Sequence, residues 1–384
     1  MPDSPTLNHA ARVLAGLGRE IPADAALRRY FVDNPRLGPR EKRAISRAVF
    51  TYFRWRQWLE GGESGQRQVA AAAALQERFE RDPAAVKVET LAARAVPEWL
   101  REEMETPADF LRQLQREPPL WLRARPGTGG RLAAALGDST ASPRSADALR
   151  YEGRQDLFLT PQFHAGAFEI QDLASQLVGL AAAPNPGETW WDACAGEGGK
   201  TLHLADLMHN KGLIWATDRS ERRLEVLKRR AARAKLFNYR AAPWAGAAAG
   251  PGGRPALPTK TKFDGVLVDA PCSGVGTWQR NPHARWTAVP RDVRELAATQ
   301  GALLSAVAGS VKPGGRLIYA VCTLTRSETE AVATAFAAAH PDFEPAALPA
   351  AARPDPAGPE TSAALLWPQA LGANGMFIAA WRRR

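Results

Sequence analysis

The chain has 384 residues, of which 45% are hydrophobic and 23% charged, and its formal net charge of +10 comes mostly from arginine. This composition predicts a globular protein of two or three domains without a membrane segment, because no apolar run approaches the ~18 residues that span a bilayer. Three cysteines, an odd number, exclude a disulfide framework, and the amino terminus lacks the apolar core of a signal peptide, so a cytoplasmic protein is expected. The excess of basic residues favours a nucleic-acid partner. A GC-rich genome, which encodes arginine in preference to lysine, is the alternative explanation.

Residues 1–115 are expected to form a helical domain. Within 39–59, apolar residues recur at the spacing of one helix face, and arginine and lysine occupy the other. The apolar face comprises Ile45, Val49, Tyr52, Phe53 and Trp55. Pro39 suits the first turn of this helix. The basic face is expected either to contact RNA or simply to be solvated.

Residues 116–182 are expected to form a small α/β module. Its predicted elements are a strand at 120–124, a turn at 127–130, a helix at 131–136, a strand or irregular segment at 149–159 and an amphipathic helix at 168–180. The Pro-Asn-Pro-Gly breaker at 184–187 ends that helix and indicates a domain boundary close to residue 182.

From residue 183 to residue 384, strand and helix patterns alternate. Strands are expected at 189–195, 213–217, around the apolar run 266–268, at 316–321, near 343 and at 376–381, and helices at 199–208, 221–234, 291–310 and 327–339. Such alternation predicts a mostly parallel sheet with helices on both faces. The Ala/Gly/Pro-rich segment 245–258 is predicted to be a flexible loop.

The segment 192–200, DACAGEGGK, joins the first strand of this region to its first helix. Glycines there let the backbone approach a ligand, and Asp218, at the end of the next strand, is placed to bind ribose hydroxyls. The pattern predicts a nucleoside-cofactor site; a tight turn with a structural acid is the alternative. Asp192 would repel a pyrophosphate but attract an ammonium, which favours S-adenosylmethionine over a dinucleotide. Lys200 lacks the spacing of a Walker phosphate loop.

Two further strands are expected to place thiols at the same edge of the sheet, because Cys272 follows the strand-like run 266–268 and Cys322 follows the strand at 316–321. Carbon 5 of cytosine attacks a methyl group only after a thiolate adds to carbon 6, and the scheme also needs an acid and a base. Cys322, Cys272 and Asp269 are candidates for these tasks. Either cysteine alone would equally suit a small buried hydrophobe, and Cys194 is expected to pack within the loop. No CxxC pair or histidine spacing indicates a metal site.

These motifs resemble the NOL1/NOP2/Sun (RsmB-like) family of RNA cytosine-5 methyltransferases. The similar segments are DAPCS at 269–273, YAVCT at 319–323, GGKT at 198–201, RNP at 280–282 with Trp286, FEIQDLAS at 168–175 and GMFIA at 375–379. The resemblance covers about 120–384 well and is looser over the first 110 residues, where 40–58 is similar to a NusB-like domain.

The resemblance implies a Rossmann-like class I methyltransferase domain at 183–384, preceded by an RRM-like module at 116–182 and a NusB-like helical domain at 1–115. It implies Cys322 as nucleophile and Cys272 as the thiol that helps to resolve the adduct, whereas the order of the DNA cytosine methyltransferases would reverse these roles. The implied catalytic set is Cys322, Cys272, Asp269 and Lys200. The implied cofactor set for S-adenosylmethionine is Cys194, Ala195, Gly196, Glu197, Gly198, Gly199, Lys200, Asp218, Arg223 and Asp269. The implied RNA-binding set is Arg280, Asn281, Pro282 and Trp286.

Three departures from the family pattern bear on affinity. Gly196-Glu197 replaces Ala-Pro, Val321 and Thr323 flank Cys322 in place of Thr and Ser, and Ala245 stands where an acid for the adenine amine is expected. They predict weaker cofactor binding rather than loss of function.

The expected function is cytosine-5 methylation of ribosomal or transfer RNA with base flipping, by a monomer that needs no metal. A non-catalytic RNA-binding or ribosome-assembly protein on the same fold is the main alternative. A methyltransferase for another substrate would leave the second thiol unexplained.

Overall fold

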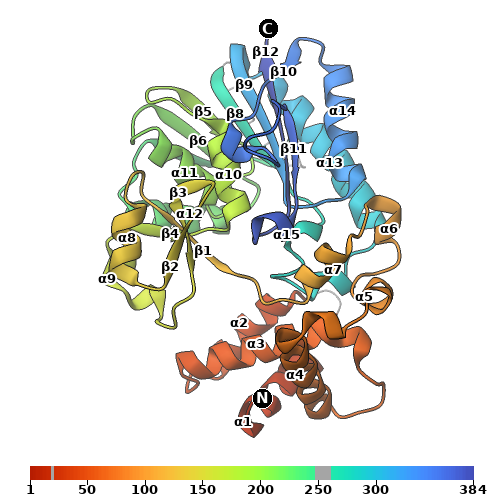
Figure 1. Ribbon diagram of the computed structural model, residues 1–384. Helices are drawn as coiled ribbons and strands as arrows, with labels where there is room; N and C mark the ends of the chain where they lie inside the picture. Colours follow the sequence, from red (N-terminus) through yellow and green to blue (C-terminus); the bar gives the residue numbers. More distant parts are fainter. Residues whose placement is uncertain (19–20, 247–260) are drawn as a thin grey trace. The chain divides into compact units, whose positions relative to one another are not determined.

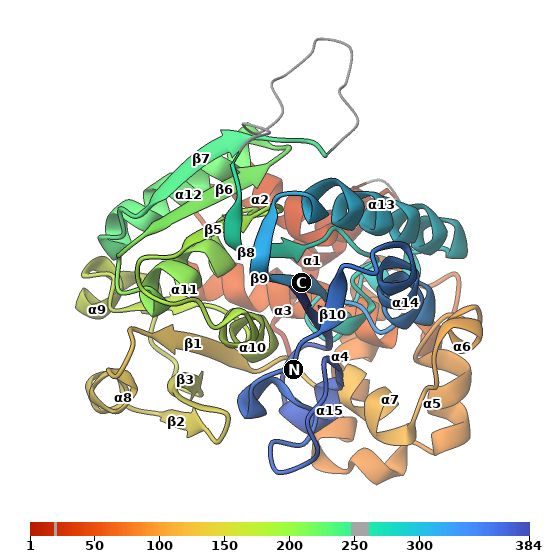
Figure 2. The same cartoon turned by 90° about the horizontal axis from the view of Figure 1, so that it is seen from above.

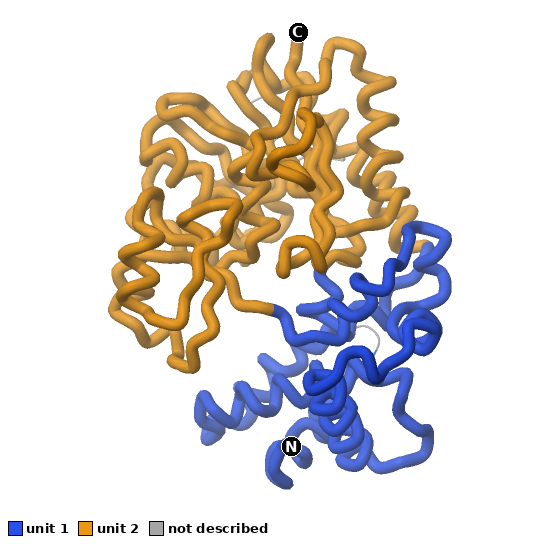
Figure 3. The backbone as a smooth tube through the Cα atoms, in the orientation of Figure 1, with its two compact units in different colours: residues 1–118, 277–290 blue, residues 119–276, 291–384 orange. Residues whose placement is uncertain are grey.

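The computed structural model describes residues 1–18, 21–246 and 261–384. They form two compact units (Figure 3), one of residues 1–118 and 277–290 and the other of residues 119–276 and 291–384. The loop predicted over 245–258 lies outside the described residues from residue 247 onward. The expected domain boundaries near 115 and 182 stay predictions.

The first unit is helical. Its helices are α1 (Ser4–Ala15), α2 (Ala23–Asp33), α3 (Pro39–Trp55), α4 (Gly65–Arg81), α5 (Val88–Arg94), α6 (Leu100–Glu103) and α7 (Ala108–Leu114). Helix α3 starts at Pro39 as predicted but ends at Trp55, where a 3-10 turn over Arg56–Trp58 follows. Ile45, Val49 and Phe53 of its apolar face are buried together with side chains of α1, α2 and α4.

The segment 277–290 joins this unit from the middle of the chain. Arg285 is fully buried and donates hydrogen bonds to the main-chain oxygens of Ala95, Leu114 and Trp278, at 2.9, 3.0 and 3.3 Å. The indole of Trp286 donates to the main-chain oxygen of Phe53 at 2.7 Å. Two of the four acceptors lie where α5 and α7 end, so the segment satisfies carbonyl groups that helix ends leave without partners.

The second unit begins with a four-stranded antiparallel sheet in the order β2-β3-β1-β4. Its elements are β1 (Leu120–Ala124), α8 (Gly129–Leu136), β2 (Ser139–Ser142), β3 (Ser145–Tyr151), α9 (Pro161–His164) and β4 (Phe168–Ile170). The helix predicted from residue 168 is wrong over its first turn, because Phe168–Ile170 pairs with β1 as a strand. Helix α10 (Leu173–Ala182) starts only after Asp172, whose side chain accepts a hydrogen bond from the main-chain nitrogen of Ala174.

The remainder of this unit is built on an eight-stranded sheet (Figure 1) in the order β10-β12-β9-β8-β5-β6-β7, with β11 paired to β12. Its strands are β5 (Thr189–Asp192), β6 (Leu213–Asp218), β7 (Tyr239–Pro243), β8 (Phe263–Asp269), β9 (Val311–Val321), β10 (Phe343–Pro345), β11 (Ala363–Leu366) and β12 (Met376–Arg383). Strands β5 to β9 run parallel, and β12 lies antiparallel to β9. The chain order reverses between β5 and β8, which places a ligand crevice at the carboxyl ends of these strands.

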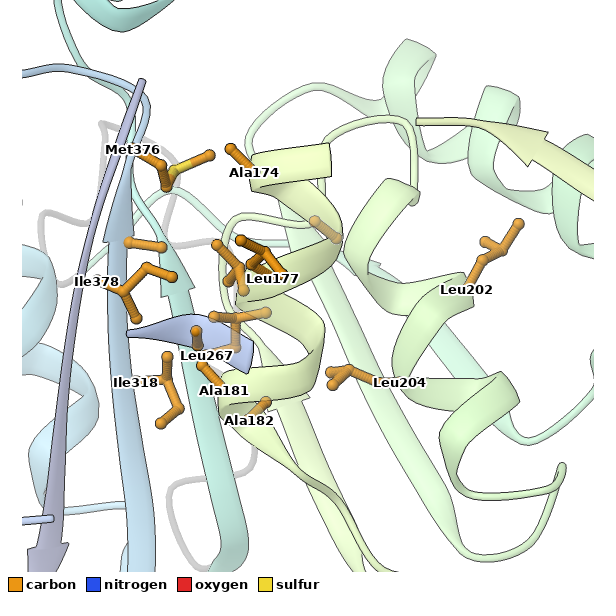
Figure 4. Close-up of a cluster of buried hydrophobic side chains, with 14 of the residues drawn as sticks. Ala174, Leu177, Ala181, Ala182, Leu202, Leu204, Leu267, Ile318, Met376 and Ile378 are labelled. Carbon is orange, nitrogen blue, oxygen red and sulfur yellow. The ribbon is translucent and has the colours of Figure 1, made fainter. Parts of the chain in front are cut away.

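Helices cover both faces of this sheet (Figure 2). Helices α10, α11 (Gly199–Leu207) and α12 (Glu221–Ala234) lie on one face, and α13 (Pro290–Ala308) and α14 (Glu330–Ala339) lie on the other. Successive side chains of β8 point to opposite faces of the sheet, so this strand contributes to the core on each face. Leu267 packs with Leu177 and Ala181 of α10 (Figure 4), whereas Val266 and Val268 belong to the core on the α13 side. The predicted α/β fold with a mostly parallel sheet is confirmed.

Two buried carboxylates connect the four-stranded sheet to helices α11 and α12. Asp206 of α11 forms ion pairs with both Arg123 and Arg125. Glu169 of β4 pairs with Arg230 and Arg233 of α12, at 3.0 Å to Arg230. Each carboxylate is compensated by two guanidinium groups. We call these two groups the arginine-paired seam.

Candidate active site

Cys272 and Cys322 meet at the carboxyl edge of the eight-stranded sheet. Strands β8 and β9 are parallel neighbours with Asp269 opposite Ala320, so the segments that follow them leave the sheet side by side. The two sulfur atoms are 3.3 Å apart, within hydrogen-bond distance. The sequence pattern of two thiols at adjoining strand ends thus has the geometry that was expected.

The two thiols differ in acidity. The hydrogen bond from Cys272 lowers the pKa of Cys322; burial and Asp269 act against this shift, whereas Lys200 adds to it. The hydrogen bond with Cys322, burial and the charge of Glu328 raise the pKa of Cys272 well above its ordinary value. Cys322 is therefore the thiol that ionises first, with Cys272 as its hydrogen-bond donor.

Lys200 and Asp269 form an ion pair beside the thiols. The Lys200 Nζ lies 2.6 Å from the Asp269 Oδ2. Lys200 is in the first turn of α11 and Asp269 is the last residue of β8, so both lie at the carboxyl edge of the sheet. Burial acts against the charge on Lys200, but Asp269 outweighs it and raises the pKa of the ammonium. A fixed positive charge therefore stands next to Cys322.

A cavity of about 410 Å³ connects these groups to the glycine loop. Most of the predicted catalytic and cofactor residues line it: Cys194, Ala195, Gly196, Glu197, Gly199, Lys200, Asp218, Arg223, Asp269, Cys272 and Cys322. Gly198 is not among the lining residues. It has φ +84°, and a Cβ there would stand 2.5 Å from Leu227, so it shapes the turn instead.

The glycine loop holds Asp218 in a fixed orientation. Gly196, with φ +55°, donates its main-chain N–H to the Asp218 Oδ2 at 3.0 Å, and Ser220 donates to the Oδ1 at 2.8 Å. Each carboxylate oxygen keeps a free lone pair for a ligand hydroxyl. This arrangement suits the ribose of a nucleoside.

Asp192 does not line the cavity. Its side chain is fully buried, and its Oδ2 accepts a hydrogen bond from the Thr201 hydroxyl at 2.7 Å. Burial raises the pKa of Asp192 to about 7, and its Oδ1 has no partner among the described residues. The expectation that Asp192 attracts an ammonium directly is wrong, because Asp192 lies beneath the loop while Asp218 and Asp269 line the cavity.

The predicted RNA-binding set is in the other unit. Arg280, Asn281, Pro282 and Trp286 all belong to the segment 277–290 of the first unit, and none of them lines the cavity. Arg280 is exposed, whereas Pro282 is buried. Their assignment as RNA contacts stays a prediction.

Several lining residues are not among the predicted site residues. They are Ala193, Arg219, Trp244, Gly246, Ala270, Pro271, Thr299 and Leu303. Trp244 follows β7 and packs on Trp191 with ring centroids 4.9 Å apart, a position that its place after a parallel strand could have indicated. Thr299 and Leu303 come from α13, and only the packing of that helix reveals them.

No group of three or more His, Cys, Asp or Glu side chains suited to a metal ion occurs within 1–18, 21–246 and 261–384. No helix in this part of the chain has both the length and the apolar character that crossing a bilayer requires.

Comparisons with known proteins agree with the fold. A model of the 16S rRNA methyltransferase RsmB/F family matches residues 179–382. The probable ribosomal RNA small subunit methyltransferase B of Bacillus subtilis (strain 168) is 37% identical over 224 residues, which cover 58% of this chain and 49% of that protein. The chain spans between 49% and 61% of the length of such curated relatives.

Solved structures share the architecture. The crystal structure of PH0851 matches with a TM-score of 0.77 and 22% identity, over 100% of both chains. A methyltransferase homolog protein from Pyrococcus horikoshii matches with a TM-score of 0.59 and 27% identity, over 72% of this chain and 90% of the other.

Proposed function

Because the chain belongs to the 16S rRNA methyltransferase RsmB/F family, we propose that it transfers a methyl group from S-adenosylmethionine to carbon 5 of a cytosine in ribosomal RNA. The observation that carries the proposal is the pair of thiols, 3.3 Å apart, on the wall of the same cavity as the glycine loop. A methyltransferase that attacks an already nucleophilic atom would need neither thiol.

The cavity fits the proposed cofactor in size and in chemistry. Asp218 offers carboxylate oxygens to ribose hydroxyls, and the open backbone at Gly196 and Gly199 admits a close ligand. Trp244, Ala245 and Leu303 give the wall an apolar part that suits an adenine ring. Bound there, S-adenosylmethionine supplies the electrophilic methyl group.

Cys322 acts as the nucleophile in this proposal. Its thiolate adds to carbon 6 of the cytosine while the ring gains a proton at nitrogen 3, and this makes carbon 5 able to attack the methyl group. Asp269, held by Lys200 at 2.6 Å, contacts the polar edge of the base. The lowered pKa of Cys322 and the raised pKa of Cys272 support this order over the reverse one.

Release of the product uses the second thiol. A base removes the carbon-5 proton, the bond between sulfur and carbon 6 breaks with its electron pair returning to the Cys322 sulfur, and nitrogen 3 releases the proton that it had gained. Cys272 stabilises the departing thiolate through the hydrogen bond that it donates across 3.3 Å. Without that donor the covalent adduct would persist longer.

A transfer assay tests the proposal. The full chain is incubated with methyl-labelled S-adenosylmethionine and ribosomal RNA, and labelled nucleosides are separated. We expect labelled 5-methylcytosine, its loss by a factor of about a thousand or more in Cys322→Ala, and a protein–RNA adduct on denaturing gels in Cys272→Ala. Label on another base, or full transfer by Cys322→Ala, would contradict it.

The same assay weighs the non-catalytic alternative, which Glu197 and Ala245 on the cavity wall favour because the first adds a negative charge and the second lacks an acid for adenine. A chain that binds ribosomal RNA but transfers no label to any RNA would support that alternative.

A further inference from the structure

Glu328 is a fully buried carboxylate next to both cysteine segments, in a 3-10 turn over Arg326–Glu328 between β9 and α14. It lies outside the cavity lining, and the proposed reaction does not use it. A buried carboxylate is costly unless it is paired or well hydrogen-bonded, so its contacts indicate what it does.

One set of contacts fixes the segment that carries Cys272. The Oε1 of Glu328 accepts a hydrogen bond from the main-chain nitrogen of Ser273 at 2.8 Å. The Oε2 accepts another from the Ser273 hydroxyl. Both bonds go to the residue directly after Cys272, so the carboxylate holds that segment by its backbone and by a side chain.

A second set fixes the segment that carries Cys322. The Oε2 of Glu328 accepts from the hydroxyls of Thr323 at 3.3 Å and Thr325 at 2.7 Å. Thr323 directly follows Cys322, and its hydroxyl also lies 2.9 Å from that of Ser273. The two residues that follow the two thiols therefore share one carboxylate.

A buried layer supports this arrangement. Gln300 of α13 donates to the Glu328 Oε1 at 3.0 Å and to the main-chain oxygen of Pro271 at 2.9 Å. Tyr319 of β9 donates to the Gln300 Oε1 at 2.9 Å and to the main-chain oxygen of Glu328 at 2.6 Å as alternative acceptors. We call Glu328, Ser273, Thr323, Thr325 and Gln300 the carboxylate clamp.

The hydrogen-bond donors to the Glu328 carboxylate are all neutral groups. The five hydrogen bonds to the carboxylate come from one main-chain N–H, three hydroxyls and one amide, all of them neutral groups. The charged groups that act on Cys272 are the Cys322 thiolate and then Glu328, and those that act on Cys322 are Asp269 and Lys200. The negative charge of Glu328 thus favours the protonated form of Cys272.

We propose that Glu328 is a positioning residue that sets the spacing of the two thiols and keeps the shared proton on Cys272, so that Cys322 carries the thiolate. This role rests on the proposed function for its use in catalysis. The clamp itself rests on the contacts of Glu328 with the residues that follow each thiol.

The order of ionisation is measured by alkylation. The full chain, kept reduced, reacts with limiting iodoacetamide from about pH 6 to about pH 9, and peptide mass spectrometry gives the rate at each cysteine. In the native protein Cys322 reacts ahead of Cys272. In Glu328→Gln the ratio of the two rates falls by about threefold to tenfold, because Cys272 loses the charge that keeps it protonated.

A matched control separates this local effect from net charge. Glu330 lies two residues away on the exposed surface, and Glu330→Gln makes the same change in charge. It leaves the alkylation ratio at the native value. A native ratio in a folded Glu328→Gln, or an equal fall in Glu330→Gln, would overturn the role in ionisation.

Glu328→Asp tests the spacing, and it remains available if the Gln variant does not fold. It keeps the charge but shortens the side chain, so it cannot reach both segments. We expect a native alkylation ratio and a several-fold slower disulfide bond between Cys272 and Cys322 when diamide oxidises the two thiols and is itself reduced to the hydrazine. A native rate of disulfide formation would overturn the positioning role.

Neither readout involves methyl transfer. A chain that alkylates as expected but methylates no RNA would overturn the proposed function and leave the clamp intact. Conversely, the native protein could methylate cytosine through Cys322 while Glu328→Gln keeps the native ratio of alkylation rates. That result would support the proposed function and overturn the role of Glu328 in ionisation.

Discussion

The second unit buries carboxylates in two different ways. In the arginine-paired seam, Asp206 and Glu169 each meet two guanidinium groups, so their charges are compensated locally. In the carboxylate clamp, the five hydrogen-bond donors to Glu328 are all neutral groups. The seam joins the four-stranded sheet to helices α11 and α12, whereas the negative charge of Glu328 raises the pKa of Cys272. The comparison indicates that the paired carboxylates contribute to stability, whereas the carboxylate with neutral donors acts on the pKa of a neighbouring thiol.

The largest expected effect is on the seam. Asp206→Asn leaves the buried Arg123 and the partly buried Arg125 without their counter-ion, and we expect the free energy of unfolding to fall by about 3–5 kcal/mol. Urea denaturation followed by circular dichroism measures it. A loss below about 1 kcal/mol would show that the seam is not a compensated ion pair. Lys228→Met, which removes an exposed ion pair with Glu225, is the matched control and should change little.

The clamp should be less sensitive to loss of charge. Glu328→Gln keeps the shape of the side chain but turns two acceptor atoms into one acceptor and one donor. The donors that face the new amide nitrogen then lose their acceptor: two donors at the Oε1 position, or three hydroxyls at the Oε2 position. We expect the free energy of unfolding to fall by about 1–3 kcal/mol in the same denaturation experiment. A loss as large as that of Asp206→Asn would remove the difference between the two regions.

Asp192 extends the comparison to a carboxylate with one hydroxyl donor only. Burial raises its pKa from the ordinary 3.8 to about 7, so the folded protein binds a proton that the unfolded chain releases. Stability from this group is therefore complete at low pH and is lost as the pH rises through about 7. Between about pH 5.5 and about pH 7.5 we expect a loss of about 1–2 kcal/mol that is absent in Asp192→Asn. Equal pH slopes in the two proteins would contradict this.

The smallest effect concerns the thiol pair. The hydrogen bond from Cys272 lowers the pKa of Cys322, so Cys272→Ala should raise it again. The midpoint of Cys322 alkylation should then move to higher pH. Cys194→Ala, which removes the third cysteine without touching the pair, should leave the midpoint in place. An unmoved midpoint in Cys272→Ala would mean that the 3.3 Å contact does not tune Cys322.

Much of the second unit could be predicted because its signals are local. Helix α12 has the predicted bounds, 221–234, because an amphipathic run is framed by a Ser220 cap and a left-handed residue at Lys235. The apolar run 266–268 lies within strand β8, because a buried parallel strand reads as a continuous apolar run. The motifs at 269–273 and 319–323 sufficed to identify the family, which the family comparison confirms.

Other elements depended on partners that are distant in the chain. Phe168–Ile170 has a helical pattern but forms a strand, because β1 offers it an edge and Asp172 caps the helix only afterward. Strand β11, at 363–366, has no counterpart in the prediction, since its pairing with β12 is what orders it. The local sequence pattern predicts secondary structure poorly where pairing with a distant strand determines it.

The residues by themselves identified which groups carry the chemistry: two thiols, an acid, a lysine and a glycine loop, each next to a strand end. The grouping of these residues at one site could be predicted because the carboxyl ends of parallel strands lie at the same edge of the sheet. The 3.3 Å contact between the thiols, the burial of Asp192 and the sharing of Glu328 by two segments came only from folding. Each of these depends on residues tens of positions apart, and no local pattern encodes how such segments pack.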